Sequence, residues 1–138
     1  MTDDVVSSVW KKLFGDYSDA FLDHTYQPRN VGSIEDADAH VRHTGPCGDS
    51  IELWLRMESG VISEITFIPD GCEGTTACGS ALTELARGKR IEDAAAISAV
   101  SIESHLDGLA EEHKHCAGLA STVLHKALGE LIGIMRRR

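Results

Sequence analysis

The sequence predicts an α+β domain: a three-stranded antiparallel sheet with helices packed over one face and a long C-terminal helix. Residues 50–57 alternate between apolar and polar side chains, and residues 61–68 are rich in β-branched and aromatic ones. The turn-forming residues 58–60 separate these segments, which is typical of a hairpin. Apolar residues at helical spacing then recur from residue 75 to 135. A length of 138 residues corresponds to one domain.

The segment before the sheet is expected to be helical. Apolar residues at helical spacing predict an N-terminal helical extension over residues 1–16, ahead of a single domain over residues 17–138. Ser18 is a suitable N-cap for a second, short helix over about 19–25.

The other elements follow from the same patterns. Residues 39–43 predict a short strand ahead of the hairpin, which completes a three-stranded meander. Because helices both precede and follow the strands, an α+β layering is expected. The predicted helices after the sheet cover 75–87, 91–97, 102–106 with Ser101 as its cap, and about 113 or 116 to 135.

Charge and composition exclude several classes of function. Thirteen basic residues against 22 acidic ones give a net charge of −9, which argues against nucleic acid as a partner. The three arginines at 136–138 are interpreted as favourable charge at a helix C-terminus. No apolar run approaches the roughly 18–20 residues of a membrane span, and the first residues are acidic where a signal peptide is basic. We therefore expect a cytoplasmic protein with no membrane association.

Three of the four cysteines are expected to form one site. Cys47 lies in a Gly-Pro-Cys-Gly-Asp turn before the first strand of the hairpin, and Cys72 follows its return strand, so both lie at one end of the hairpin. Cys116 lies near the start of the last helix, where the helix dipole is expected to lower its pKa. In a reducing cytosol, such thiols indicate metal binding or thiol chemistry rather than disulfides.

The residues around these thiols leave alternatives open. Cys78, inside a predicted helix, is interpreted as a buried apolar residue, but its place in the first turn keeps a ligand or relay role open. Asp49 either caps a local turn or adds an oxygen donor. His115 is either a ligand or a solvated residue at a helix start. The remaining histidines are expected to be ordinary surface or capping residues: His24, His40, His43, His105, His113 and His125.

Three thiolates with one Asp or His form a mixed donor set. Such a set can hold tetrahedral Zn²⁺. It can equally hold a [2Fe–2S] cluster, and one non-thiolate ligand then weakens retention compared with four cysteines. A weakly held cluster suits delivery better than permanent electron transfer.

Four motifs occur in order and with compatible spacing between residues 17 and 132. They are residues 17–24 with Pro-Arg-Asn-Val-Gly-Ser at 28–33, Pro-Cys-Gly-Asp at 46–49, Gly71-Cys72 followed by 80–84 and 88–89, and His115-Cys116 ahead of the long helix. On these motifs the chain resembles the IscU/NifU-N-type iron–sulfur cluster assembly scaffold family.

The resemblance implies a non-enzymatic scaffold. Cys47, Cys72 and Cys116 are implied as the cluster cysteines, Asp49 as the residue that tunes cluster lability, and His115 as a nearby or alternative ligand. A labile [2Fe–2S] cluster would be assembled from iron and from sulfur passed by a cysteine desulfurase, and then transferred to acceptor proteins. A [4Fe–4S] product at a homodimer and Zn²⁺ at the same ligands are also implied.

Two features of the chain bear on the alternatives. The family's Leu-Pro-Pro-Val-Lys segment, read by a specialised DnaK-type chaperone, falls on residues 109–113, where both prolines are absent, so dependence on that chaperone is not supported. The zinc-dependent SufU branch carries an insertion between its second and third cysteines, whereas the 44 positions from Cys72 to Cys116 look uninserted. A zinc-bound sulfurtransferase that accepts persulfide is therefore the second hypothesis, and a structural zinc domain is the third.

Overall fold

The computed structural model describes residues 5, 6, 9 and 17–137, so the extension expected over 1–16 lies mostly outside the described residues. None of the helices in this described part is both long enough and apolar enough to span a membrane. The elements are α2 (Asp19–Tyr26), β1 (Ala39–Thr44), β2 (Ser50–Glu58), β3 (Val61–Asp70), α3 (Glu73–Ala86), α4 (Ile91–Ala94), α5 (Ala99–His105), the 3₁₀ turn η1 (Glu111–His113) and α6 (Lys114–Arg136).

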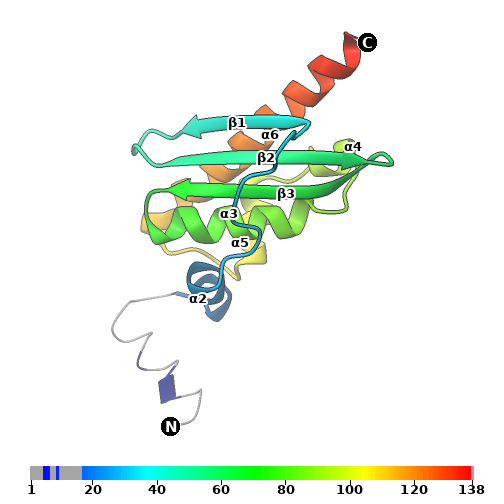
Figure 1. The fold of residues 1–138 in the computed structure, drawn as a ribbon. Helices are drawn as coiled ribbons and strands as arrows, with labels where there is room; N and C mark the ends of the chain where they lie inside the picture. Colours follow the sequence, from blue (N-terminus) through cyan, green and yellow to red (C-terminus); the bar gives the residue numbers. More distant parts are fainter. Residues whose placement is uncertain (1–4, 7–8, 10–16, 138) are drawn as a thin grey trace.

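The three strands form the predicted antiparallel meander, in the order β1-β2-β3. Thr44 pairs with Ser50, and Ser50 pairs with Asp70. The β1–β2 turn and the end of β3 therefore lie at one end of the sheet, on the left of Figure 1. This end carries the sequence segments around Cys47 and Cys72.

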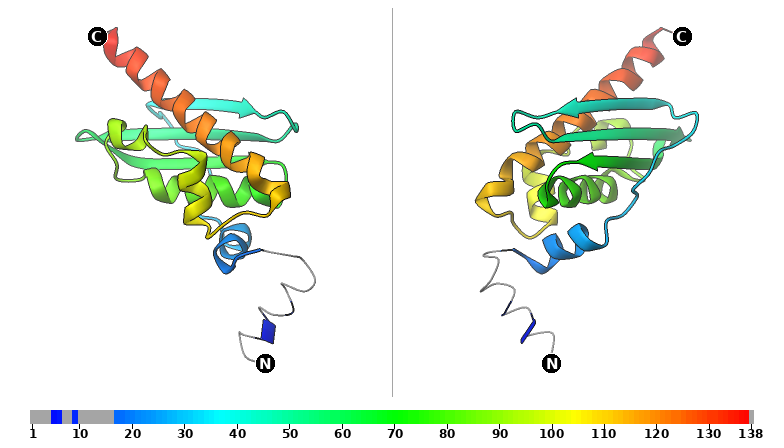
Figure 2. Two further views of the ribbon diagram at one scale, coloured as in Figure 1. Left: turned by 180° about the vertical axis from the view of Figure 1, so that it is seen from behind. Right: turned by 60° about the vertical axis from the view of Figure 1, so that its left-hand side comes forward.

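One face of the sheet is covered by helices, which confirms the predicted fold class. Helices α3 and α6 run across this face, and α5 packs against both of them (Figure 2). Ile51, Leu53 and Leu55 of β2 point into this core and are fully buried. The apolar positions of the alternating strand are thus the inward ones, as the period of two requires.

The opposite face of the sheet is partly covered as well. Trp54 alternates with the core residues, yet it is buried. Its ring stacks on that of His40 with 4.6 Å between the ring centroids. The connection over residues 27–38 runs from α2 to β1 past the strands (Figure 1) and hydrogen-bonds to the backbones of Phe67 and Leu55.

Three helix boundaries differ from the predicted ones by two residues or more. α3 begins at Glu73 rather than 75, because Cys72 adopts the extended conformation of an N-cap. Ser98 rather than Ser101 is the N-cap of α5, and the two side chains form a reciprocal capping box. The helix predicted over 91–97 extends only from Ile91 to Ala94.

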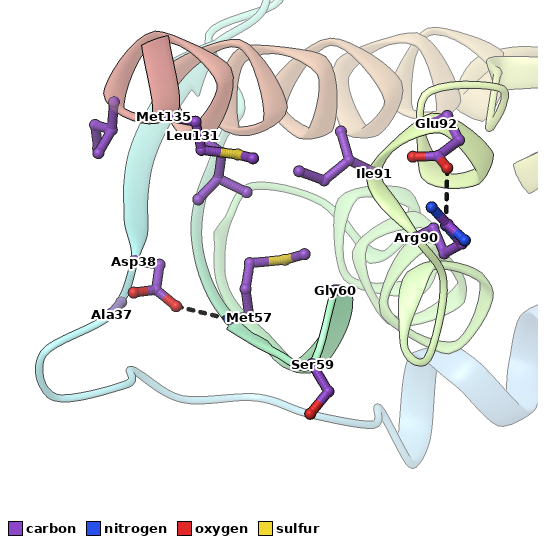
Figure 3. Close-up of a pocket in the computed structure, with 11 residues that line it drawn as sticks. Ala37, Asp38, Met57, Ser59, Gly60, Arg90, Ile91, Glu92, Leu131 and Met135 are labelled. Atoms are coloured by element: carbon purple, nitrogen blue, oxygen red, sulfur yellow. Dashed lines mark hydrogen bonds and ion pairs between the residues drawn. The ribbon is translucent and has the colours of Figure 1, made fainter. Parts of the chain in front are cut away.

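A cavity of about 670 Å³ lies at the other end of the sheet from the Cys47 turn. It opens between the β2–β3 turn, α4 and the last turns of α6. Met57, Leu131 and Met135 form its apolar wall, and an ion pair between Arg90 and Glu92 lies on its rim (Figure 3). The cavity contains no thiol, so the sulfur chemistry of the chain belongs to the opposite end.

Candidate functional site

The fold brings three cysteine-bearing segments to one end of the sheet. Cys47 and Asp49 lie in the β1–β2 turn, and Cys72 lies between β3 and α3 as the N-cap of the helix. Cys116 lies in the first turn of α6, which packs on β1 and β2. The proximity of the Cys47 and Cys72 segments, predicted from the hairpin, is confirmed at the level of the strand register.

Cys72 and Cys116 form the centre of the site. Their Sγ atoms lie 3.7 Å apart, and both thiols are free. Cys116 is completely buried, and this burial raises its pKa to about 12. The expected lowering of that pKa by the helix start is therefore wrong, because loss of water around the thiolate outweighs the favourable helix dipole.

His113 lies beside these two thiols, although the sequence indicated an ordinary surface or capping residue. It is buried, and its side chain makes no capping hydrogen bond to α6. Its Nδ1 lies 3.7 Å from the Sγ of Cys72. Its ring stacks on Phe21 of α2 with 5.2 Å between the centroids. The imidazole is thus held in the wall of the site.

The side chain of Asp49 forms hydrogen bonds to two residues of the site, Thr75 and Cys72. Its Oδ2 accepts a 2.8 Å hydrogen bond from the hydroxyl of Thr75 and a 3.4 Å bond from the backbone N–H of Cys72. The bond from Thr75 and the contacts with Cys72 lower the pKa of Asp49. Asp49 is therefore an ionised carboxylate fixed next to the thiol of Cys72.

The outer side of the site is more open. A pocket of about 270 Å³ is lined by Cys47, Asp49 and His115, together with residues of α6. Cys47 and His115 are exposed. The Nε2 of His115 lies 3.6 Å from the Sγ of Cys116. The pocket gives a molecule from solution access to the thiol of Cys47 and to the side chains of Asp49 and His115.

Two groups of three donors share the thiol of Cys116. We call Cys72, His113 and Cys116 the inner group, and Asp49, His115 and Cys116 the outer group; within each, one ligand atom per residue lies within 4.8 Å of the others. Among the described residues, neither group includes Cys47. The five residues predicted from the sequence thus gather at one end of the sheet, but Cys47 lies on the rim.

Gly74 makes room for the inner group. A Cβ atom at this position would lie 2.6 Å from the Nδ1 of His113 and 2.9 Å from the Sγ of Cys116. Only glycine lets the first turn of α3 approach these two side chains so closely. The site is therefore a cradle for sulfur and nitrogen donors, and soft donors of this kind fit zinc, iron or an iron–sulfur cluster.

Cys78 lies outside this arrangement. It is fully buried in the apolar core beneath the sheet, and burial raises its pKa well above the ordinary value. The prediction that Cys78 is buried among apolar residues is confirmed.

The structure adds two residues that were not expected at the site, His113 and Thr75. His113 is three positions before Cys116, and this spacing places two side chains on the same side of a helical turn. Thr75 is three positions after Cys72, the N-cap of α3. At this spacing, the side chain of the first-turn residue lies on the same side of the helix as that of the N-cap. Its hydroxyl lies 3.7 Å from the sulfurs of both Cys72 and Cys116.

Known proteins are similar to this chain in sequence and in fold. The family model of the NifU-like N terminal domain matches residues 16–136. The Iron-sulfur cluster assembly scaffold protein IscU 1 of Archaeoglobus fulgidus is 39% identical over 113 residues, which cover 81% of this chain and 74% of that protein. The Iron-sulfur cluster assembly scaffold protein IscU of Haemophilus influenzae is 34% identical over 120 residues, which cover 83% of this chain and 94% of that protein.

Solved structures with lower sequence identity share the fold. The N-terminal part of a NifU-like protein from Brucella abortus superposes with a TM-score of 0.69 at 13% identity, over 84% of this chain and 94% of that one. A protein described as the iron–sulfur cluster assembly scaffold of the SUF system in Fervidobacterium islandicum gives a TM-score of 0.68 at 21% identity, over 81% of this chain and 96% of that one. The match of the family model across residues 16–136 and the identity to the two scaffold proteins show that the chain belongs to the IscU/NifU-N scaffold family.

Proposed function

We propose that this chain is a scaffold on which a [2Fe–2S] cluster is assembled and from which it is transferred to acceptor proteins. Cys47, Cys72 and Cys116 are the proposed cluster ligands, with Asp49 or His115 as the fourth. The observation that carries the proposal is the pair of unbonded thiols, Cys72 and Cys116, whose sulfurs lie 3.7 Å apart at the end of the sheet.

The donor set supports temporary rather than permanent binding. Thiolates bind cluster iron tightly, whereas carboxylate oxygen is a harder and less well matched donor. The Asp49 carboxylate already accepts hydrogen bonds from Thr75 and from the backbone of Cys72. Its binding to iron therefore competes with these bonds, which favours release.

The proposed partners follow from the chemistry of the cargo. Free thiols suit a reducing cytoplasm, and membership of the scaffold family supports a cysteine desulfurase that delivers sulfur as persulfide. Cys47 and Cys72 are both exposed, and Cys47, which belongs to neither donor group, is the thiol proposed to take sulfur from such a protein. Each sulfur delivered in this form takes up two electrons from a separate reductant before it becomes cluster sulfide. An acceptor protein with vacant cysteines completes the transfer, and the relatives are themselves named scaffold proteins.

The test is anaerobic assembly with Fe²⁺, cysteine, a reductant and a cysteine desulfurase. We expect visible sulfur-to-iron charge-transfer absorption, acid-labile sulfide in equal amount to iron, and passage of both to an apo-ferredoxin. Light scattering during assembly shows whether the chain dimerises, and Mössbauer spectra of the same sample show whether the product is a [4Fe–4S] cluster. A protein that binds iron but never retains labile sulfide would contradict the proposal.

A zinc-bound sulfurtransferase is the second candidate. The compact inner group of two sulfurs and one nitrogen is the observation that favours it, since zinc accepts such mixed tetrahedral sets. In that case the zinc-loaded protein would stimulate the desulfurase, carry persulfide on one cysteine, and assemble no cluster. Stimulation that requires zinc, in the absence of labile sulfide, would favour this candidate.

A further inference from the structure

We infer that His113 is a metal ligand and that, with Cys72 and Cys116, it holds a divalent ion such as Fe²⁺ or Zn²⁺ at the buried end of the site. This inference rests on the proposed function, because it concerns how the same site receives its first metal ion. It adds an inner binding position, distinct from the outer group of Asp49, His115 and Cys116.

The distances in the inner group match those of a tetrahedral metal site. With metal–sulfur bonds of about 2.3 Å and metal–nitrogen bonds of about 2.0–2.1 Å, tetrahedral geometry separates two sulfurs by about 3.8 Å, and a sulfur from a nitrogen by about 3.6 Å. The sulfurs of Cys72 and Cys116 lie 3.7 Å apart, and the Nδ1 of His113 lies 3.7 Å from the sulfur of Cys72. Two of the three donor separations therefore fit a bound ion as they stand, and the Nδ1 of His113 and the sulfur of Cys116 lie within 4.8 Å of each other.

The hydrogen bonds of His113 direct the correct nitrogen at the thiols. The hydroxyl of Tyr17 donates its proton to the carboxylate of Glu112 at 2.6 Å, so its oxygen has only lone pairs left to offer. The Nε2 of His113, 3.2 Å from that oxygen, must then be the donor. In the neutral tautomer that this contact favours, the proton is on Nε2 and the lone pair of Nδ1 is on the side of Cys72. Metal-binding histidines are oriented in the same way by a partner on their second nitrogen.

The position of the inner group allows the metal ion and the incoming sulfur to bind to different cysteines. His113 and Cys116 are buried, and Phe21 and Gly74 pack against the imidazole. An ion bound here uses Cys72 and Cys116 but leaves the exposed Cys47 unligated. Metal and sulfur can then arrive at different thiols of one site.

The inference is tested with Cd²⁺ bound to the reduced full-length chain, because ¹¹³Cd couples to ligating ¹⁵N nuclei in NMR spectra. We expect coupling to the Nδ1 of His113. We also expect His113→Gln to weaken Zn²⁺ binding by more than the about 10–100-fold that loss of an outer-shell partner costs. Tyr17→Phe, which keeps the ring but loses the hydrogen bond, should weaken binding by about tenfold. His125→Gln is the matched control on α6, since His125 bonds to the carbonyl of Ile97 away from the site.

The outcomes separate this inference from the proposed function. Coupling to His115 alone, or unchanged zinc affinity in His113→Gln, overturns the role of His113. If Cys72→Ser and Cys116→Ser abolish binding in the same experiment, the proposed site survives that result. If these two variants bind zinc as tightly as the unchanged chain, the proposed site itself is wrong. If the far-ultraviolet circular dichroism of His113→Gln shows that this variant is unfolded, the role of His113 is decided by the zinc affinity of Tyr17→Phe and by the ¹¹³Cd–¹⁵N coupling in the unchanged chain.

Discussion

The hydroxyl of Thr75 donates a 2.8 Å hydrogen bond to the Oδ2 of Asp49, and this bond joins the first turn of α3 to the β1–β2 turn. The two residues are 26 positions apart, yet both contact Cys72: the hydroxyl of Thr75 lies 3.7 Å from its sulfur, and the Oδ2 of Asp49 lies 3.4 Å from its backbone nitrogen. Thr75 is completely buried, so its hydroxyl has no access to water as an alternative partner. The hydrogen bond holds the carboxylate of Asp49 in place, and this carboxylate is proposed to be the weakest ligand of the cluster.

Thr75→Val should raise the pKa of Asp49 toward its ordinary value. Valine keeps the shape of threonine but cannot donate the hydrogen bond that is the main cause of the lowered pKa. A carboxyl whose pKa is lowered by folding stabilises the protein above its ordinary pKa, and this contribution disappears as the pH falls through the lowered value. The variant should therefore lose less stability over that acid range. Carbon-13 NMR titration of Asp49 measures the shift.

The neighbouring variant Thr76→Val serves as the control for this experiment. Thr76 lies on the same turn of α3 and is partly exposed. An equal change in the pKa of Asp49 in both variants would mean that the hydrogen bond from Thr75 is not the cause.

Asp49→Ala should retain the assembled cluster longer than the unchanged chain. The substitution removes a hard oxygen donor, which matches cluster iron poorly, and with it a path for solvent or an acceptor thiol. The rate of absorbance loss on addition of an iron chelator provides the measurement. Equal or faster loss from the variant would show that Asp49 does not promote release.

Single replacement of Cys47, Cys72 or Cys116 by serine should abolish stable cluster binding. A hydroxyl is a poor substitute for a soft thiolate, and a site with fewer than four cysteines has none to spare. Visible absorption after anaerobic reconstitution checks each variant. Retention of the cluster in any one of the three removes that cysteine from the ligand set.

Cys78→Ser is the matched control for these variants, with a different expected result. Because Cys78 is buried among apolar side chains, a hydroxyl there should lower the free energy of unfolding by about 1–3 kcal/mol. The cluster should still assemble, since the core position of Cys78 is separate from both donor groups. Loss of the cluster in a folded Cys78→Ser variant would show that the ligand assignment is wrong.

The part of the site that depends on strand connectivity could be predicted from sequence. In a hairpin, the residues before the first strand and after the second meet at one end, and the pairing of Ser50 with Asp70 places Cys47 and Cys72 accordingly. The alternation of β2 also identified Ile51, Leu53 and Leu55 as core residues. The first inference needs only the antiparallel connection of a hairpin, and the second needs only the period of a strand.

The parts that depend on tertiary packing could not be predicted. The pKa of Cys116 rises because α6 carries the thiol into the core, and position in a helix does not reveal that depth. The spacing of His113 three positions before Cys116 is the one signal in the sequence, but His113 lies in a 3₁₀ turn ahead of α6, so the spacing alone does not show that its side chain reaches the thiols. Its role depends on Tyr17, which is 96 positions away in the sequence.

Gly74→Ala should impair metal binding without unfolding α3. Alanine is a better helix former than glycine by about 1 kcal/mol, so the helix itself should gain stability. The added Cβ would lie 2.6 Å from the Nδ1 of His113, however, and 2.9 Å from the Sγ of Cys116, which forces these two donors out of the inner group. Zinc affinity measured by competition with a chelator should fall.

Gly129→Ala on α6 separates this steric effect from the general consequence of adding a methyl group. A Cβ at residue 129 would contact nothing within 4 Å, so this variant should keep the zinc affinity of the unchanged chain and gain about 0.5–1 kcal/mol of stability. Gly74 approaches His113 and Cys116 only because it lacks a side chain. Equal zinc affinity in the two alanine variants would therefore mean that the ion does not use the inner group.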